Sequence, residues 1–270
     1  MEAQTAKPPP RRVLVTGGAM RLGAALCETF AEAGWEVICH YRNGQAQAQA
    51  LCEQLRARGF VASAIYADLA QNMECTGLME TIQDEHGPLD CLVNNASLFI
   101  ADSGADFDPA QVLAQLQVNL LAPLTLAKLM ANASDPAASG QDLSVIHILD
   151  QKVYNLNPDY FSYTISKLAL ERAVGLQAQS LAPRLRVCGV APGLMYQSGP
   201  QSADNFALAA NANLLHRPTD PMDVARTCLF LASTPSITGT TVSVDNGQHL
   251  VPLPRDIMFV VEDLLKKHAL

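Results

Sequence analysis

The sequence lacks several features that would place the protein in other functional classes. It has no basic tract, and its 270 residues carry a formal net charge of −8, which argues against nucleic acid as a partner. The seven cysteines are scattered, without a Cys-x-x-Cys spacing or a histidine cluster, so we predict neither disulfides nor a metal site. No run approaches about eighteen apolar residues, and the first residues lack a secretory signal. We therefore expect no membrane partner and a cytoplasmic location.

The sequence does contain one regular alternation of predicted strands and helices. Strands are predicted near 12–17, 35–40, 61–66, 89–94, 143–149, 185–191 and 240–244, and helices near 21–34, 44–58, 72–86, 109–132, 161–182 and 220–233. Right-handed crossovers between such units produce an α/β fold, a Rossmann-type doubly wound parallel sheet of about seven strands with helices on both faces. We predict a disordered tail over 1–11 and one domain over 12–248, because α/β domains of this size are often undivided.

A glycine-rich turn joins the first predicted strand to the first helix, with the sequence Thr16-Gly17-Gly18-Ala19-Met20-Arg21-Leu22-Gly23. Such a turn leaves backbone N–H groups free at a helix N-terminus, where a dinucleotide pyrophosphate can bind. Gly17 permits the tight turn, Gly23 lets strand and helix approach closely, and Arg21 adds a cation beside the phosphates. Many strand–helix turns contain glycine for conformational reasons alone, so this motif needs support from the rest of the chain.

The end of the second predicted strand indicates which dinucleotide is bound. A site that prefers NAD usually has Asp or Glu there, to bind the ribose 2′-hydroxyl. No acidic residue lies between Val37 and Ala50, and the segment His40-Tyr41-Arg42 follows the strand instead. We predict that His40 and Arg42 pair with a 2′-phosphate, which favours NADPH. The alternative is a solvated basic turn.

Two further motifs suit a nicotinamide site. Tyr163 and Lys167 are four residues apart in the predicted helix 161–182, so they share one helix face. A phenol with a pKa near 10 becomes a useful acid or base when a neighbouring cation eases its ionisation, and Lys167 can do this while holding the nicotinamide ribose. The run Asn94-Asn95-Ala96-Ser97 follows an apolar stretch, and its small residues suit a strand end close to a flat ligand. Either motif alone is common, and their place after a dinucleotide turn favours catalysis.

Together these motifs resemble the short-chain dehydrogenase/reductase family, from Val13 to about Gly247. The resemblance implies that Asn119, Tyr163 and Lys167 are catalytic. The segment near 193–217 is rich in Ser, Asn and Ala, so we predict a lid over the substrate there. The tail, 249–270, contains apolar residues that we predict to pack on another subunit, and the resemblance implies a homotetramer or homodimer. The cofactor contacts that it implies are Gly17, Arg21, Leu22, Gly23, His40, Tyr41, Arg42, Asp68, Leu69, Asn95, Ala96, Ser97, Tyr163, Lys167, Pro192 and Gly193.

One departure from the family pattern narrows the resemblance. The family's catalytic serine, thirteen residues before the tyrosine, is replaced by Asp150. Together with Arg21 and the pair His40-Tyr41, this aspartate resembles the branch of pteridine reductases and dihydromonapterin reductases. That branch implies a stacking surface for the pterin ring at Phe99 and a catalytic Asp150 that supplies protons through Tyr163. The implied substrate contacts are Arg21, Phe99, Asp150, Tyr163, Leu194 and Tyr196.

The sequence thus predicts an NADPH-dependent reductase of a pterin or dihydropterin, with a C=N bond as the reduced group. A 3-oxoacyl or other carbonyl reductase is the alternative, although Asp150 removes the hydroxyl that would bind a carbonyl. A non-catalytic NADP(H)-binding protein is a second alternative, against which Asn119, Tyr163 and Lys167 argue. Phe99 as a packing residue and Asp150 as a strand-end cap stay open as structural interpretations.

Overall fold

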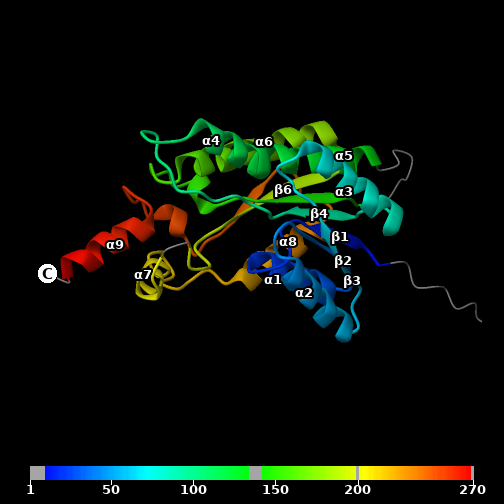
Figure 1. Cartoon of the computed structure of the whole chain (residues 1–270), viewed down its shortest axis with the longest axis horizontal. Coiled ribbons are helices and arrows are strands. Elements are labelled where there is room, and N and C mark those ends of the chain that lie inside the picture. The colour runs from blue at the N-terminus through cyan, green and yellow to red at the C-terminus, as the bar shows by residue number, and fades with distance from the viewer. Residues whose placement is uncertain (1–9, 134–141, 199–200, 269–270) are drawn as a thin grey trace, which may run out of the picture.

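The computed structural model describes residues 10–133, 142–198 and 201–268, and it forms a parallel sheet between two layers of helices (Figure 1). The seven strands follow the order β3-β2-β1-β4-β5-β6-β7, and every neighbouring pair is parallel. The predicted doubly wound sheet is therefore confirmed. The strands are Arg12–Val15 (β1), Glu36–Tyr41 (β2), Ala62–Tyr66 (β3), Cys91–Asn94 (β4), Ser144–Ile148 (β5), Arg186–Pro192 (β6) and Thr241–Val244 (β7).

Helices cover both faces of the sheet, and each face has its own hydrophobic core (Figure 1). The alternation of strand side chains explains this: Val13 and Val15 of β1 enter one core, whereas Leu14 between them enters the other. One face carries α1 (Leu22–Glu32), α2 (Gln45–Ala57) and α8 (Pro221–Ala232). The other face carries α3 (Asn72–Glu85), α4 (Pro109–Leu116), α5 (Ala122–Ala133) and α6 (Phe161–Leu181).

The strand order reverses between β1 and β4, which pair directly in the middle of the sheet. After β1 the chain moves outward to β2 and β3, whereas after β4 it moves the other way to β5, β6 and β7. The segments that leave β1 and β4 therefore diverge above the same sheet edge. In open α/β sheets this crevice, at the carboxyl ends of the strands, is where ligands bind.

The predicted helix 109–132 is interrupted by a π-helical turn, Gln117–Leu121, between α4 and α5. Such turns arise where one extra residue is accommodated in a helix, and they cannot be seen in hydrophobic periodicity. Within the described residues, Pro109–Ala133 is the one helical stretch long and apolar enough, by length and composition, to cross a membrane. Ala122, Leu126 and Ala127 are fully buried in the second core, as in a core helix.

Two helices that the sequence did not predict lie together beside the carboxyl edge of the sheet. Helix α7 (Ala203–Ala209) falls inside the predicted lid, and α9 (Ile257–His268) falls inside the predicted tail. The two helices lie side by side (Figure 1). They pack through a small separate cluster that includes Ala209, Ile257 and Val261. Short 3-10 turns, Gln151–Val153 (η2) and Gln248–Leu250 (η3), lie on the loops nearby. Most of the predicted disordered tail, residues 1–9, lies outside the described residues.

Candidate active site

A cavity of about 500 Å³ opens at the carboxyl ends of β1, β4, β5 and β6. It begins at the glycine turn (residues 16–23) and extends past Tyr163 to the segment before α9. Of the residues predicted to form the site, Tyr41 and Asn119 do not line this cavity. The residues that do are Gly17, Arg21, Leu22, Gly23, His40, Arg42, Asp68, Leu69, Asn95, Ala96, Ser97, Phe99, Asp150, Tyr163, Lys167, Pro192, Gly193, Leu194 and Tyr196.

The glycine turn has the geometry that a dinucleotide pyrophosphate requires. Gly17 has a φ of 61°, in the left-handed region that favours glycine. A Cβ at Gly23 would lie 2.0 Å from the carbonyl oxygen of Gly17, so only glycine fits there. Arg21 precedes the first turn of α1 with a φ of 53°, and no acidic residue lies in that first turn. The turn thus presents a free helix N-terminus beside a cation, which suits a phosphate.

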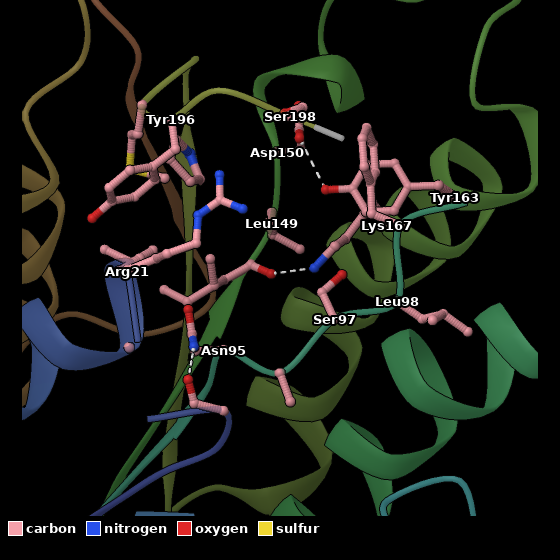
Figure 2. A pocket seen from close by; sticks show the side chains of 18 of the residues that line it. Arg21, Asn95, Ser97, Leu98, Leu149, Asp150, Tyr163, Lys167, Tyr196 and Ser198 are labelled. Atoms are coloured by element: carbon pink, nitrogen blue, oxygen red, sulfur yellow. Dashed lines mark hydrogen bonds between the residues drawn. The ribbon is translucent and has the colours of Figure 1, made fainter. Parts of the chain in front are cut away.

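Asn95 and Thr16 hold the glycine turn against the loop that leaves β4. The Asn95 side-chain amide donates to the carbonyl oxygens of Thr16 and Gly17, each at 3.0 Å (Figure 2). In return the Thr16 hydroxyl accepts the backbone N–H of Asn95 at 2.9 Å and of Ala96 at 3.0 Å. Asn95 therefore fixes the shape of the turn, and its amide is engaged within the protein.

His40 is not positioned for the predicted ion pair with a 2′-phosphate. Its ring is 2 % exposed; Nδ1 accepts the backbone N–H of Gly17 at 3.1 Å, and Nε2 lies 3.0 Å from the carbonyl oxygen of Ala67. Burial lowers the pKa of His40 to about 4, so the ring is neutral at physiological pH. His40 supports the glycine turn through its hydrogen bond to the backbone of Gly17.

Arg42 is the cation that remains for a 2′-phosphate. Its side chain is 44 % exposed at the rim of the cavity, and Nη1 lies 3.5 Å from Oδ1 of Asp68. This exposed pair leaves the guanidinium free to turn toward a phosphate. Tyr41 points the other way, into the core beside α1 and α2, with its ring edge against Tyr66.

Asp150, Tyr163 and Lys167 meet at the centre of the cavity (Figure 2). The Tyr163 hydroxyl donates to Oδ2 of Asp150 at 2.9 Å, and the backbone N–H of Lys152 donates to Oδ1 at 2.9 Å. Lys167, one helical turn after Tyr163, donates from Nζ to the carbonyl oxygen of Ile148 at 2.8 Å. Helix α6 and the end of β5 thus bring an acid, a phenol and an ammonium together.

Burial perturbs all three groups. It raises the pKa of Asp150, against the opposing N–H and positive charge of Lys152. Burial and the adjacent Asp150 charge raise the pKa of Tyr163 well above its ordinary value, so the phenol stays protonated. Burial also lowers the pKa of Lys167 to about 8. Strongly perturbed titratable groups that converge in a cavity are typical of an active site.

Asn119 lies behind this centre, in the π-helical turn, with no exposed surface. Its Oδ1 accepts the backbone N–H of Leu98 at 2.7 Å, and its Nδ2 donates to the Leu98 carbonyl at 2.8 Å and the Ser166 hydroxyl at 3.0 Å. The predicted catalytic role of Asn119 stays a prediction. These hydrogen bonds connect the loop after β4 to Ser166 of α6, the residue before Lys167.

An aromatic cluster forms the side of the cavity beyond Tyr163. Phe99 stacks on Tyr160 with ring centroids 4.1 Å apart and meets Tyr163 edge-on at 4.6 Å. Phe99 is still 43 % exposed, so a second flat ring can pack against it. On the opposite side, the Arg21 guanidinium lies 4.8 Å from the centroid of the Tyr196 ring (Figure 2).

Several residues that line the cavity are not among the predicted site residues: Lys152, Tyr160, Gln248, Asp256 and Met258. Tyr160 is three residues before Tyr163, and Lys152 is two after Asp150, so closeness to predicted residues was a usable signal for these two. Asp256 and Met258 come from the predicted tail, and no local motif links them to the site.

Comparison with known proteins agrees with this geometry. A family model described as enoyl-(acyl carrier protein) reductase matches residues 18–249. The chain belongs to the short-chain dehydrogenase/reductase family. Its curated relatives include dihydromonapterin reductase of Enterobacter sp., 27 % identical over 90 % of this chain and 98 % of the relative, and pteridine reductase 1 of Leishmania tarentolae, 29 % identical over 91 % and 99 %.

Solved structures show the same fold. FolM alternative dihydrofolate reductase 1 from Brucella canis, complexed with NADP, is 38 % identical with a TM-score of 0.84, over 89 % of this chain and 94 % of that one. The Brucella suis protein, also in complex with NADP, gives the same identity and TM-score. The chain is therefore an NADPH-dependent oxidoreductase of this family.

Proposed function

We propose that the protein is an NADPH-dependent reductase of a dihydropterin. The observation that carries the proposal is the 2.9 Å hydrogen bond from the Tyr163 hydroxyl to the half-buried Asp150 carboxylate, next to the exposed ring of Phe99. A pterin offers a flat heteroaromatic ring for stacking and an amidine-like edge whose N–H groups match a carboxylate. The relatives named for dihydromonapterin, pteridine and dihydrofolate reduction support the same substrate class.

The carboxylate argues against a simple ketone as substrate. A ketone oxygen gains negative charge as it is reduced, and hydrogen-bond donors stabilise that charge. An ionised Asp150 has only acceptors to offer and would repel the oxygen. With a pterin, in contrast, the same carboxylate can accept substrate N–H groups.

The residues of this chain can deliver the proton that reduction of a C=N bond needs. Tyr163 is protonated, because burial and Asp150 raise its pKa. Its hydroxyl is therefore the group in the cavity that would give a proton to a substrate nitrogen. Asp150, hydrogen-bonded to that hydroxyl, can take up a proton from solvent and return it to Tyr163 after the transfer. Lys167 is anchored at Ile148 and orients the ribose of the cofactor. Bound NADPH supplies the hydride.

Cofactor selection is proposed to rest on Arg42. No acidic residue occupies the end of β2, where a ribose 2′-hydroxyl would be bound, and Arg42 stands at the rim in its place. The remaining predicted cofactor contacts, including Asp68, Leu69, Pro192 and Gly193, lie along the same cavity.

Steady-state NADPH oxidation with dihydromonapterin, dihydrobiopterin, dihydrofolate and an acetoacetyl thioester tests the proposal. We expect kcat/KM for the best dihydropterin to exceed that for the thioester by at least about a hundredfold, since a site built for hydrogen bonding rejects analogues that lack the group. Turnover of the thioester without any dihydropterin turnover would instead support the carbonyl reductase. NADPH binding without turnover of any of them would support the non-catalytic alternative.

We also propose a homotetramer or homodimer in the cytoplasm, with residues 193–217 as a lid and 249–270 at an interface. The exposed Leu113 of α4 and Leu176 of α6, two helices that pack together on one face of the sheet, support an assembly. Light scattering of the purified protein measures its mass, and a monomer at micromolar concentration would contradict the assembly.

A further inference from the structure

Lys152 is a buried ammonium for which the proposed chemistry has no direct use. It lies in η2, is 3 % exposed, and lines the cavity. Its Nζ donates to Oδ1 of Asn157 at 2.8 Å and to Oδ2 of Asp256 at 3.0 Å. Burying an ammonium is costly unless it is paired, so this position is held by its partners.

The same residue also holds the catalytic carboxylate. The backbone N–H of Lys152 donates to Oδ1 of Asp150 at 2.9 Å, while the Tyr163 hydroxyl donates to Oδ2. The two oxygens of Asp150 are thus oriented by one donor from η2 and one from α6. A shift of the Lys152 backbone would rotate the carboxylate away from Tyr163.

Asp256 belongs to a C-terminal arm (residues 255–258) that is fixed to the loop before α6. Arg255 forms a bidentate pair with Asp159, with Nη2 to Oδ1 at 2.7 Å and Nε to Oδ2 at 2.9 Å. The backbone N–H of Asp256 also donates to Asp159 at 2.7 Å, and Oδ1 of Asp256 accepts the N–H of Met258 at 3.1 Å. The arm therefore presents Asp256 to Lys152 in one defined orientation.

We infer that Lys152, held by Asp256 of the C-terminal arm, is a positioning residue that keeps the Asp150 carboxylate aligned with Tyr163. The role of Asp150 in turnover rests on the proposed function. The action of Lys152 on Asp150 rests on its backbone N–H bond to Oδ1 and on the ion pair of its Nζ with Asp256. The arm is then part of the active site of its own chain, linked to the reacting groups through one ion pair.

The charges around Asp150 give the inference a pH signature. Lys152 on η2 and Tyr163 and Lys167 on α6 face Asp150, and Asp256 faces Tyr163 from the arm. The positive charge of Lys152 lowers the pKa of Asp150, so its removal raises that pKa. The limb of the pH–rate profile that Asp150 governs must therefore move to higher pH when Lys152 loses its charge.

The test compares K152M, K152R and the double variant K152M/D256N with the wild type, in pH profiles of kcat and kcat/KM. We expect K152M to lower kcat roughly ten- to a hundredfold with little change in the KM for NADPH, and to move the Asp150 limb up by about one pH unit. K152R keeps the charge and should leave the limb in place. K152M alone leaves the Asp256 carboxylate without its partner, whereas the double variant removes both charges. The double variant therefore still tests the inference if K152M fails to fold.

The matched control is K266M, which removes an exposed ion pair with Glu262 on α9 and should leave both kcat and the profile unchanged. NMR titration of isotope-labelled aspartate carboxyls, with D150N to assign the signal, reports the pKa of Asp150 without turnover. A raised pKa in K152M and in the double variant supports the inference even if no dihydropterin is reduced, which would refute only the proposed function. An unchanged Asp150 pKa in folded K152M and double variants overturns the inference, whatever the substrate.

Discussion

The substitution Asp150→Ser separates pterin chemistry from ketone chemistry. In the wild type the carboxylate receives two hydrogen bonds, from the Tyr163 hydroxyl and the Lys152 backbone, both at 2.9 Å. Serine is shorter and uncharged, so its hydroxyl can keep the cap bond from the Lys152 N–H but offers no ionised acceptor to the Tyr163 hydroxyl. Tyr163 is only 6 % exposed, and its hydroxyl would then face the cavity without this partner.

The size of the effect follows from the bonds that are lost. A hydrogen bond to a charged group contributes about 1.5–3 kcal/mol, and each 1.4 kcal/mol is about tenfold in rate. If the substrate N–H makes one such bond to Asp150 in the transition state, Asp150→Ser lowers kcat/KM for a dihydropterin by about ten- to a hundredfold. The affinity for NADPH should stay the same, since the glycine turn and Arg42 lie elsewhere in the cavity. Activity on simple ketones should rise, because a serine hydroxyl can donate to a carbonyl oxygen.

The assay is NADPH oxidation with a dihydropterin and with a ketone, together with NADPH binding measured by fluorescence. Asp108→Ser is a matched control: Asp108 caps α4 by accepting the N–H of Ala110, and serine caps a helix equally well. Equal dihydropterin activity in Asp150→Ser and Asp108→Ser would refute the role assigned to the carboxylate. Asp150 would then be a cap on η2, which its bond to the Lys152 N–H also allows.

Three further substitutions test the rest of the site. Arg42→Ala should lower the preference for NADPH over NADH by about tenfold or more with little change in kcat, because one charge-assisted contact to the 2′-phosphate is lost; an unchanged ratio of kcat/KM values would contradict it. Tyr163→Phe should lower kcat by on the order of a hundredfold while NADPH binding is kept, since only the proton donor is removed; near-normal turnover would assign the proton to another group. Gly23→Ala should abolish NADPH binding or lower Tm sharply, because its Cβ would lie 2.0 Å from the Gly17 oxygen. The control Gly77→Ala in α3, with open space around it, should be neutral or slightly stabilising. Equal melting temperatures and NADPH affinities in the two variants would refute the close packing.

Local signals in the sequence were sufficient for the fold and for part of the cavity lining, whereas other lining residues, such as Asp68 and Pro192, were implied by the family resemblance. The strands are short apolar runs between helical segments, and the doubly wound order follows from the handedness of crossovers. Gly17 and Gly23 occupy positions where the backbone itself demands glycine, so their role is visible in the letters. Tyr163 and Lys167 share a helix face through spacing alone.

The errors and omissions involve orientation and long-range contacts. His40 appeared available for a phosphate, yet its ring turns inward because both nitrogens find backbone partners at Gly17 and Ala67. Lys152 and Asp256 are 104 residues apart, and only the path of the chain after β7 brings them within 3.0 Å. Helix α9 is amphipathic, but its apolar side packs on α7, which was not predicted either.

The separate packing of α7 and α9 has a consequence for how this protein can change during evolution. Their shared cluster, with Ala209, Ile257 and Val261, is distinct from the two cores that hold the sheet, while Ile257 and Met258 line the cavity. Substitutions that reshape this end of the site therefore leave the packing under the glycine turn undisturbed. Substrate preference can therefore change at this end of the cavity while the core beside the glycine turn keeps its packing.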